Sequence, residues 1–439
     1  MAGIVHGCYK SGGQMRPDWT LIGYSDCPQT TLDGHAYAVD IHDNWDTSIT
    51  NTSSMYYQDY KLMYFPKNID TSNITNMQAM FKESNIEDLV IDASGVTGSG
   101  LNEICKGAVN LRSVDIEGVA NYNDSVITTL ANSFQDCYSL EEIDISKQPG
   151  RRPGLWYVTS VTSIDHMCSG CRSLKEFSIV MGNGETTLTN AGDAFRDCFN
   201  MEYLKVNLEG CNRFGCYAMG SKTANGTLCD IDIGSYNNLD GQYNFQNSKI
   251  AAGSHIQLER MSTTQMELFK GSTFDINNTS WLWLDASTTI NAVNMFNNAT
   301  LPHGLSGMAA LNIYNISNAN SMFRSSHFTG TNKTIDFTNI SFNNCTNFQS
   351  MFEASEVVTI NGRIDLTYAT NLSYMFTNCH NLDNATLDNI LDWLIDANSY
   401  TGTKSLAAIG FTAADYPAAT IQSLSNYSSF TSAGWVIGY

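Results

Sequence analysis

The sequence predicts an α/β solenoid with a parallel β-sheet on one face and short helices or turns on the other. Two observations predict this fold. A phrase recurs through most of the chain, mostly at intervals between 24 and 29 residues, and its copies contain apolar residues at strand spacing. One copy cannot bury its own apolar face, whereas stacked copies form a continuous core.

The phrase is clearest at residues 69–91, IDTSNITNMQAMFKESNIEDLVI. Its Ser/Thr/Asn-rich start, residues 70–76, is suited to cap a helical turn. Three apolar residues then share one helical face, because they fall at i, i+3 and i+4. They are Met77, Met80 and Phe81. Leu89 and Ile91 lie on either side of Val90, which is the alternation of a strand. We therefore expect a cap, one or two helical turns, a polar turn and a short strand in each copy.

A Phe-like anchor residue marks each copy of the phrase. The anchors are Phe81, Cys105, Phe134, Cys168, Phe195, roughly Met219, Phe245, Phe269, Phe296, Phe323, Phe352 and Phe376. In the clearest copies apolar residues follow the anchor by six, nine and eleven positions, as after Phe134. This spacing is typical of leucine-rich repeats and predicts about twelve of them over residues 65–385. The copies between 207 and 290 are degenerate.

The two ends of the chain depart from the phrase, and a solenoid needs caps because its ends otherwise expose core. Residues 1–64 are rich in glycine and aromatic residues, which predicts a β-rich cap or attachment domain. Residues 386–439 predict a helical cap. Within it TLDNILDWLIDA, residues 386–397, has apolar residues at helical spacing, and residues 412–427 form a second helical stretch.

DTSNITNMQAMF, residues 70–81, resembles the repeat of BspA-like leucine-rich-repeat surface proteins, in which Asp-Thr-Ser-Asn-Val-Thr-Asn-Met precedes Met-Phe. NLSYMFTNCHNL (371–382) and ISNANSMFRSSHF (316–328) match the core of that repeat, and the similarity covers about 300 of 439 residues. The bacterial members are mostly cell-surface proteins associated with adhesion, and related repeats occur in gut bacteriophage proteins. The resemblance implies a surface protein, from a bacterium or from a phage.

The charge balance limits the partners. The chain has 23 basic and 43 acidic residues, a net charge of -20, and should repel nucleic acid. Its apolar runs are too short to predict membrane insertion, and residues 1–20 show no signal peptide. We expect partners among proteins or glycans on a host or cell surface, with other virion proteins and an oligomer as further options. The expected location is the virion or the outside of a cell.

Two groups of residues could carry metal or redox chemistry, but each has a simpler interpretation. The chain has twelve cysteines, and Cys168 and Cys171 form a Cys-x-x-Cys pair. They occupy positions of the repeated core, so we interpret them as buried thiols and expect no metal or cofactor. Residues 33–46, DGHAYAVDIHDNWD, combine His35, Asp40 and His42. This segment is either a polar loop beside a strand or, less simply, a metal or acid–base site.

The outward positions of the predicted strands suggest a binding surface. Side chains alternate along a strand, so the residue between two inward apolar residues points outward. Those positions are Val90, Asp115, Asp144, Ser178, Lys205, Asp232, Gln257, Trp283, Asn312, Asp336 and Asp365. In SWLWLDAS, residues 280–287, two tryptophans should share the outward face. The predicted binding surface is Trp281, Trp283, Asp232, Gln257, Asn312, Asp336 and Asp365; the alternatives are a solvated sheet face or tryptophans covered by a neighbouring subunit or loop.

The sequence thus yields three hypotheses for function. The first is a non-enzymatic recognition or structural protein of a phage virion, such as a fibre, tail or head-surface protein. The second is a bacterial cell-surface adhesin of the BspA-like type. The third is an enzyme whose site lies in residues 1–64, the part of the chain outside the predicted repeats.

Overall fold

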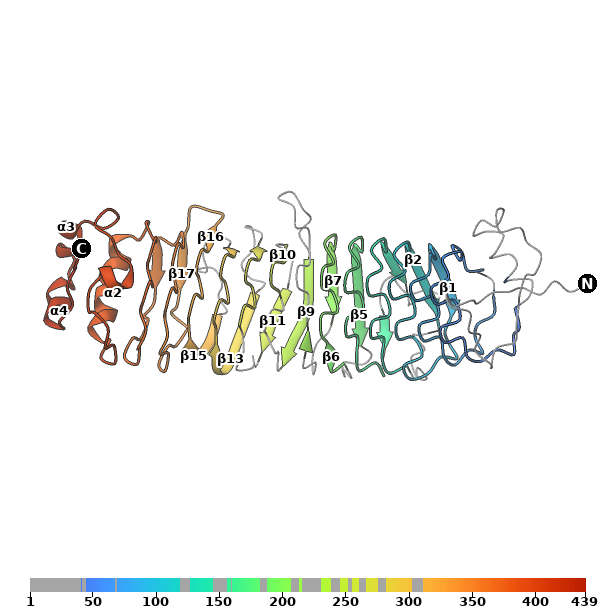
Figure 1. Ribbon diagram of the computed structural model, residues 1–439. Coiled ribbons are helices and arrows are strands. Elements are labelled where there is room, and N and C mark those ends of the chain that lie inside the picture. Colours follow the sequence, from blue (N-terminus) through green and yellow to red (C-terminus); the bar gives the residue numbers. More distant parts are fainter. Residues whose placement is uncertain are drawn as a thin grey trace, which may run out of the picture. The chain divides into compact units, whose positions relative to one another are not determined.

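The computed structural model describes residues 41, 45–67, 69–118, 127–144, 156–158, 160–181, 188–206, 213–214, 230–237, 245–251, 255–259, 266–274, 282–301 and 311–439. The chain divides into two compact units, residues 1–229 (unit 1) and residues 230–439 (unit 2). Within each unit the chain winds as a parallel β-solenoid with little helix, and strands of successive coils lie side by side (Figure 1). The predicted parallel solenoid is therefore confirmed.

Unit 1 pairs its strands in parallel. One sheet contains β1 (Asp88–Asp92), β2 (Ser113–Glu117) and β3 (Glu142–Asp144) in that order. In a second group β5 (Glu176–Met181) pairs with both β4 (Trp156–Val158) and β7 (Tyr203–Val206). The short strands β6 (Asn190–Ala191) and β8 (Arg213–Phe214) pair with each other.

Unit 2 has the same parallel arrangement. Its longer strands are β9 (Asp230–Asn237), β11 (His255–Glu259), β13 (Leu282–Asn291) and β15 (Leu311–Asn318), paired in that order. A second row contains β10 (Lys249–Ile250), β12 (Thr273–Phe274), β14 (Thr300–Leu301) and β16 (His327–Phe328). Strands β17 (Thr334–Asp336) and β18 (Thr359–Asn361) form a separate pair.

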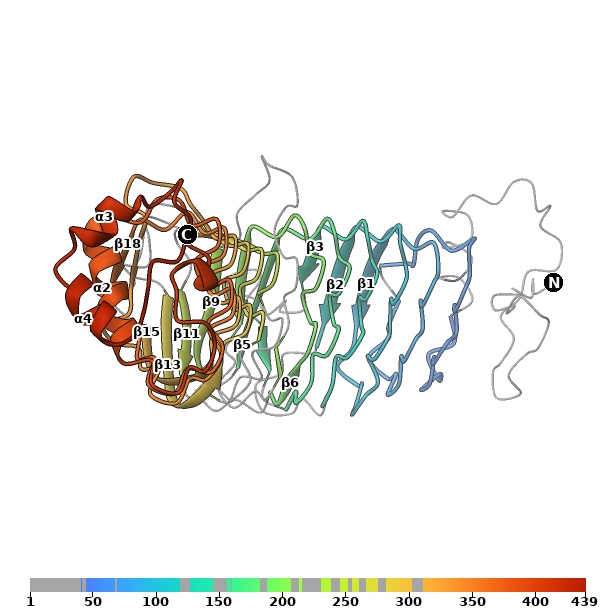
Figure 2. The same ribbon diagram turned by 60° about the vertical axis from the view of Figure 1, so that its left-hand side comes forward.

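Helices lie at the C-terminal end of unit 2 (Figure 2). They are α2 (Asn384–Ile395), the 3-10 helix η3 (Ala407–Ile409), α3 (Ala418–Gln422) and α4 (Tyr427–Ser432). Asp383 caps α2, because its side chain accepts a hydrogen bond from the N–H of Thr386 at 2.7 Å. The apolar face predicted for this helix is buried: Leu387, Ile390, Leu391 and Leu394. The second predicted helical stretch contains α3 and the first residue of α4.

The turn around each anchor is not the predicted helix. Ala79 and Glu83 have φ angles of 54° and 57°, and a left-handed residue interrupts a right-handed helix. Met77, Met80 and Phe81 are nevertheless fully buried, as their spacing predicts. The positions two before and two after the anchor are left-handed in other coils as well: Ser54 and Gln58, Glu103 and Gly107, Asn132 and Asp136, His166 and Gly170, Asp193 and Asp197, Glu267 and Gly271, Asn294 and Asn298, Ser321 and Ser325, Ser350 and Ala354, Tyr374 and Asn378.

Hydrogen bonds from coil to coil hold these turns. The backbone N–H groups of alternate residues donate to carbonyl groups of the following coil at 2.8–3.0 Å: Met77 to Gly100, Ala79 to Asn102, Phe81 to Ile104 and Glu83 to Lys106. The anchor Phe352 makes the same bond to Met375 in unit 2. These buried N–H groups are thus satisfied without the i−4 carbonyl of a helix.

Short polar side chains make the bends between turns and strands. The Asp70 carboxylate accepts from the N–H of Ser72 at 3.1 Å, and the Asn76 amide oxygen accepts from the N–H of Gln78 at 2.9 Å. Residues 70–76 therefore form Asx turns, not a helix cap. Other asparagines bond in the same way to the residue two positions on: Asn51, Asn190, Asn291, Asn318, Asn347 and Asn371.

The anchors build the core. Each predicted anchor within the described residues is buried, and Met219 lies outside those residues. In unit 2 the anchor rings stack in one series with centroids 5.3–5.8 Å apart: Phe245, Phe269, Phe296, Phe323, Phe352 and Phe376. In unit 1 large and small anchors alternate from Phe81 onward: Phe81, Cys105, Phe134, Cys168 and Phe195. The anchor of the repeated phrase is thus a core residue in each described coil.

The repeat begins earlier than predicted. Tyr56 stacks on Phe81 with centroids 5.6 Å apart, and its N–H donates to the carbonyl of Met80 at 2.8 Å. Ser54 and Gln58 have the left-handed conformation of the other turns. These residues form a coil of the solenoid, so the predicted boundary between residues 64 and 65 is too late. Tyrosine in place of the Phe anchor hides this coil in the sequence.

Candidate binding surface

The predicted outward positions of unit 1 lie side by side on its strands. In β1 and β2, Val90 and Asp115 are half-buried between buried neighbours, and they are cross-strand partners. Asp115 in turn pairs with Asp144 of β3. Ser178 and Lys205 are partners in β5 and β7. The alternation read from the sequence is therefore correct here, and it produces a polar strand face with acidic residues on β2 and β3.

Strand register shows which residues lie opposite Trp283 and Asn312 of the predicted surface. Trp283 pairs with Gln257, while Trp281 lies outside the described residues. Asn312 pairs with Asp285, so it lies two residues further along the strand than Trp283. The sequence cannot reveal this offset, because a loop of variable length precedes each strand.

Asp232 is also offset from the row containing Gln257. It pairs with His255, and the register then shifts, so that Ser235 lies opposite Gln257. A shift of this kind marks a β-bulge, in which one strand has an extra residue. Asp232 and Gln257 therefore lie on neighbouring strands but do not form one cross-strand pair. The degenerate repeats in this region hide the bulge from sequence analysis.

Asp336 and Asp365 are turn-forming residues. The Asp336 carboxylate accepts from the N–H of Thr338 at 2.8 Å, and the Asp365 carboxylate accepts from the N–H of Thr367 at 2.9 Å. Asp336 ends β17, whereas Asp365 follows β18 outside any strand. Their repeated spacing reflects Asx turns, and an aspartate that bonds to its own backbone is less available to a ligand.

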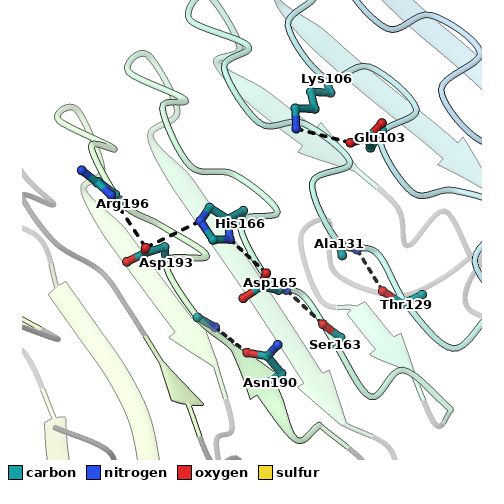
Figure 3. Close-up of polar contacts among 11 residues, drawn as sticks. Glu103, Lys106, Thr129, Ala131, Ser163, Asp165, His166, Asn190, Asp193 and Arg196 are labelled. Atoms are coloured by element: carbon teal, nitrogen blue, oxygen red, sulfur yellow. Dashed lines mark hydrogen bonds and ion pairs between the residues drawn. The ribbon is translucent and has the colours of Figure 1, made fainter. Parts of the chain in front are cut away.

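The turns of unit 1 carry a second polar group, which the sequence analysis did not find. The ring of His166 lies between two carboxylates: Nδ1 is 3.0 Å from Asp165 and Nε2 is 3.6 Å from Asp193 of the next coil (Figure 3). Arg196 reaches the same Asp193 oxygen at 3.8 Å. Because the left-handed turn places residues of adjacent coils beside one another, side chains 27 residues apart meet.

A similar contact joins the neighbouring coils nearer the N-terminus. Glu103 pairs with Lys82 at 2.8 Å and with Lys106 at 3.3 Å (Figure 3 shows the second pair). Burial alone would raise the pKa of Glu103, but hydrogen bonds from the two lysines outweigh burial and hold this pKa below its usual value. Two of these contacts, Lys82 with Glu103 and His166 with Asp193, join adjacent coils and add to the backbone hydrogen bonds between them.

Neither polar group has the arrangement of a metal site. Among the residues that the structure describes, no three His, Cys, Asp or Glu side chains are grouped closely enough to hold a metal ion. The segment with His35, Asp40 and His42 falls almost entirely outside that part of the chain. No helix in the described ranges is long and apolar enough to cross a membrane.

The described cysteines are buried free thiols: Cys105, Cys137, Cys168, Cys171, Cys198, Cys345 and Cys379. Burial raises the pKa of Cys345 and of Cys379 to about 12. The Cys198 thiol donates to the carbonyl of Cys168, the anchor of the preceding coil, at 3.1 Å. These cysteines are therefore core residues, as interpreted from the sequence. A protonated, buried thiol is a poor nucleophile and a poor metal ligand.

The stacked coils and their shared anchor define a repeat β-solenoid protein. The family described as "Mycoplasma protein of unknown function, DUF285" matches residues 30–90, 100–203 and 263–393. These ranges cover more than half of the chain, which therefore belongs to this family. The family is related to the BspA-like surface repeat proteins. Searches of curated proteins and of solved structures find no significant match.

Proposed function

We propose that the chain is a non-enzymatic recognition and structural protein displayed outside the cell, as a fibre, tail or head-surface appendage of a phage virion. One observation carries the proposal: the coils share their interior and differ in their exterior. Anchors, left-handed positions and Asx turns recur, whereas the cross-strand positions of the sheets change from Val90 to Asp115 and from Ser178 to Lys205. A uniform scaffold with a varied surface suits recognition.

We also propose that the solenoid is a leucine-rich repeat of the BspA-like type with about twelve repeats. Its support is the spacing after Cys105, where Leu111, Val114 and Ile116 follow at six, nine and eleven positions and are buried. The Met-Phe pairs that end at Phe81, Phe296, Phe323, Phe352 and Phe376, and the family match, add to this support.

A second candidate function is a bacterial cell-surface adhesin, and the family match favours it because that family is related to surface repeat proteins. Both candidates share one biochemical activity, which is binding to a protein or glycan on a surface. They differ in where the protein is located. The net charge of -20 disfavours nucleic acid as a ligand of either.

Location separates the two candidates. We would quantify the protein by mass spectrometry in purified virions and in cell envelopes of uninfected cells. Enrichment in virions at a fixed copy number relative to a capsid protein supports the appendage. Enrichment in envelopes of uninfected cells supports the adhesin. Recovery in the cytosol alone contradicts both.

A further inference from the structure

The exposed apolar side chains of unit 1 share one repeat position. In the described part of this unit the large hydrophobic residues that are exposed are Tyr60, Val109 and Tyr138, with exposed fractions of 59%, 39% and 38%. Each lies four residues after an anchor, where the turn leads into the strand. Single exposed apolar residues are common on proteins. Here exposed apolar residues recur at the same position of three coils, which indicates a shared role.

This position forms a continuous line along the coils, which we call the corner column. Its members are Tyr60, Asn85, Val109, Tyr138, Arg172 and Phe199. The Asn85 amide donates to the carbonyl of Tyr60 at 2.7 Å, which joins the first two members. The Arg172 guanidinium carbon lies 4.3 Å from the ring centroid of Tyr138. At about 4.8 Å per coil, Tyr60 and Tyr138 are about 14 Å apart.

The fold itself does not require apolar residues at this position. The equivalent residues of unit 2, four positions after each anchor, are Lys249, Thr273, Thr300, His327, Glu356 and His380. These side chains are polar, and the turns that carry them have the same left-handed residues as those of unit 1. The apolar character of the corner column is thus a property of the unit 1 surface and not of the turn.

Carboxylates lie beside the corner column. Where the chain enters the strands of unit 1, three to four residues beyond the column, four exposed acidic residues outnumber two exposed basic ones: Glu141, Glu142, Glu176 and Glu202 against Arg112 and Lys175. Lys175 pairs with Glu141 at 3.2 Å on this edge, and both side chains are more than half exposed. Aromatic faces and carboxylates attract the same ligand, a cation. The contact of Arg172 with Tyr138 shows this attraction within the chain.

We propose that the corner column of unit 1 is a docking site for an extended, arginine- or lysine-rich segment of a partner protein. The inference rests on the proposed recognition function and names its partner. Side chains four residues apart in an extended segment are about 13–14 Å apart, which matches the spacing of Tyr60 and Tyr138. A second copy of this chain fits poorly, because each copy has a net charge of -20.

The test uses the full chain and a labelled nine-residue peptide with arginine at alternate positions in a Gly/Ser background. Fluorescence anisotropy at low salt should show binding that weakens as salt is added. A matched peptide with glutamine in place of arginine should bind at least tenfold more weakly. The double variant Tyr60→Ser/Tyr138→Ser should also lose at least tenfold in affinity, whereas Tyr60→Phe/Tyr138→Phe should retain binding because it keeps both rings.

A control variant, Tyr314→Ser/Tyr368→Ser, removes two exposed tyrosines of unit 2 and should leave the affinity unchanged. Equal loss in this control, no binding of the arginine peptide, or binding unaffected by the Tyr60 and Tyr138 changes would overturn the docking site. So would Tyr60-dependent binding of neutral oligosaccharides without any peptide binding. If the protein is found in virions or envelopes but does not bind the peptide, only the docking site is overturned. The proposed function then stands.

Discussion

Residues with positive φ determine how each coil turns. Ala79, Glu103 and Tyr374 adopt the left-handed conformation without being glycine. Such a residue costs about 1–2 kcal/mol in backbone strain, which the hydrogen bonds to the next coil offset. No single residue type marks these positions, so composition does not reveal them. Apolar residues at i, i+3 and i+4 are buried equally well by a tight turn, and for this reason the sequence suggested a helix.

Ala354 tests the left-handed conformation in isolation. Its side chain is exposed, its φ is 55°, and its N–H donates to the carbonyl of Thr377. Ala354→Val should lower the free energy of unfolding by about 1–3 kcal/mol, because a β-branched residue is strained there. Ala354→Gly should stay within about 1 kcal/mol of the wild type. Urea denaturation measures both. An equal effect of Asn339→Val, at an exposed position with no positive φ, would contradict this reason.

Glu356 makes part of the stability of unit 2 dependent on pH. Its carboxylate accepts from Lys333 at 2.9 Å and from His327 at 3.1 Å, and chiefly the Lys333 bond lowers its pKa to about 2. A depressed pKa adds stability that is present above the unfolded value, near 4.5, and is lost as pH falls toward 2. Because the side chain is 38% exposed, we expect only about 1 kcal/mol.

The measurement compares urea unfolding of the wild type and Glu356→Gln between pH 3 and pH 7. The wild type should be more stable by about 1 kcal/mol at pH 7, and the difference should shrink below pH 4.5. If the difference in unfolding free energy stays constant from pH 3 to pH 7, the charge of Glu356 is not the cause of the stability loss in Glu356→Gln.

At the scale of the element, the stacked anchors link each turn to the next. Phe296 lies between Phe269 and Phe323, with ring planes within 10° of parallel. An aromatic pair contributes about 0.5–1.5 kcal/mol beyond its buried area. The coils of unit 2 are therefore joined by one series of side-chain contacts in addition to their backbone hydrogen bonds.

Phe296→Ala should lower the free energy of unfolding by about 3–5 kcal/mol, because it removes a fully buried ring and leaves a cavity between two others. Phe296→Leu should cost less, since it fills part of that cavity. Thermal or urea denaturation measures both variants. Tyr368→Ala, at an exposed tyrosine, is the control and should change stability by about 0.5 kcal/mol or less. A small effect of Phe296→Ala would mean that the ring stack is not part of the core.

Sequence periodicity predicted the elements whose positions depend on burial alone. The anchors, the alternation of Leu89 and Ile91, and the apolar face of α2 follow from it. Strand register does not follow from periodicity, because the shift between His255 and Ile256 depends on one unpaired backbone residue. Contacts such as that of His166 with Asp193 join equivalent positions, two residues before successive anchors, but the predicted helical turn would not have placed these positions side by side.

At the scale of the whole molecule, the surface charge constrains the partner more than any single residue does. Basic side chains of the chain are partly used within it, as in the pairs of Lys82 with Glu103 and of Arg363 with Asp392. With 43 acidic and 23 basic residues, the remaining field is negative. Long-range attraction of a basic or neutral partner is therefore favoured over binding to nucleic acid. Recognition at close range still needs groups that contact the ligand.

We propose that the tryptophans of SWLWLDAS are such groups in unit 2. Register pairs Leu282 with Ile256 and Leu284 with Leu258, so Trp283 occupies the intervening position opposite Gln257. Alternation along the strand predicts that Trp281 and Trp283 share the outward face. The double variant Trp281→Ser/Trp283→Ser should then leave the thermal unfolding midpoint nearly unchanged and weaken binding of the ligand or assembly of the particle. A large loss of stability would instead place both indoles in the core.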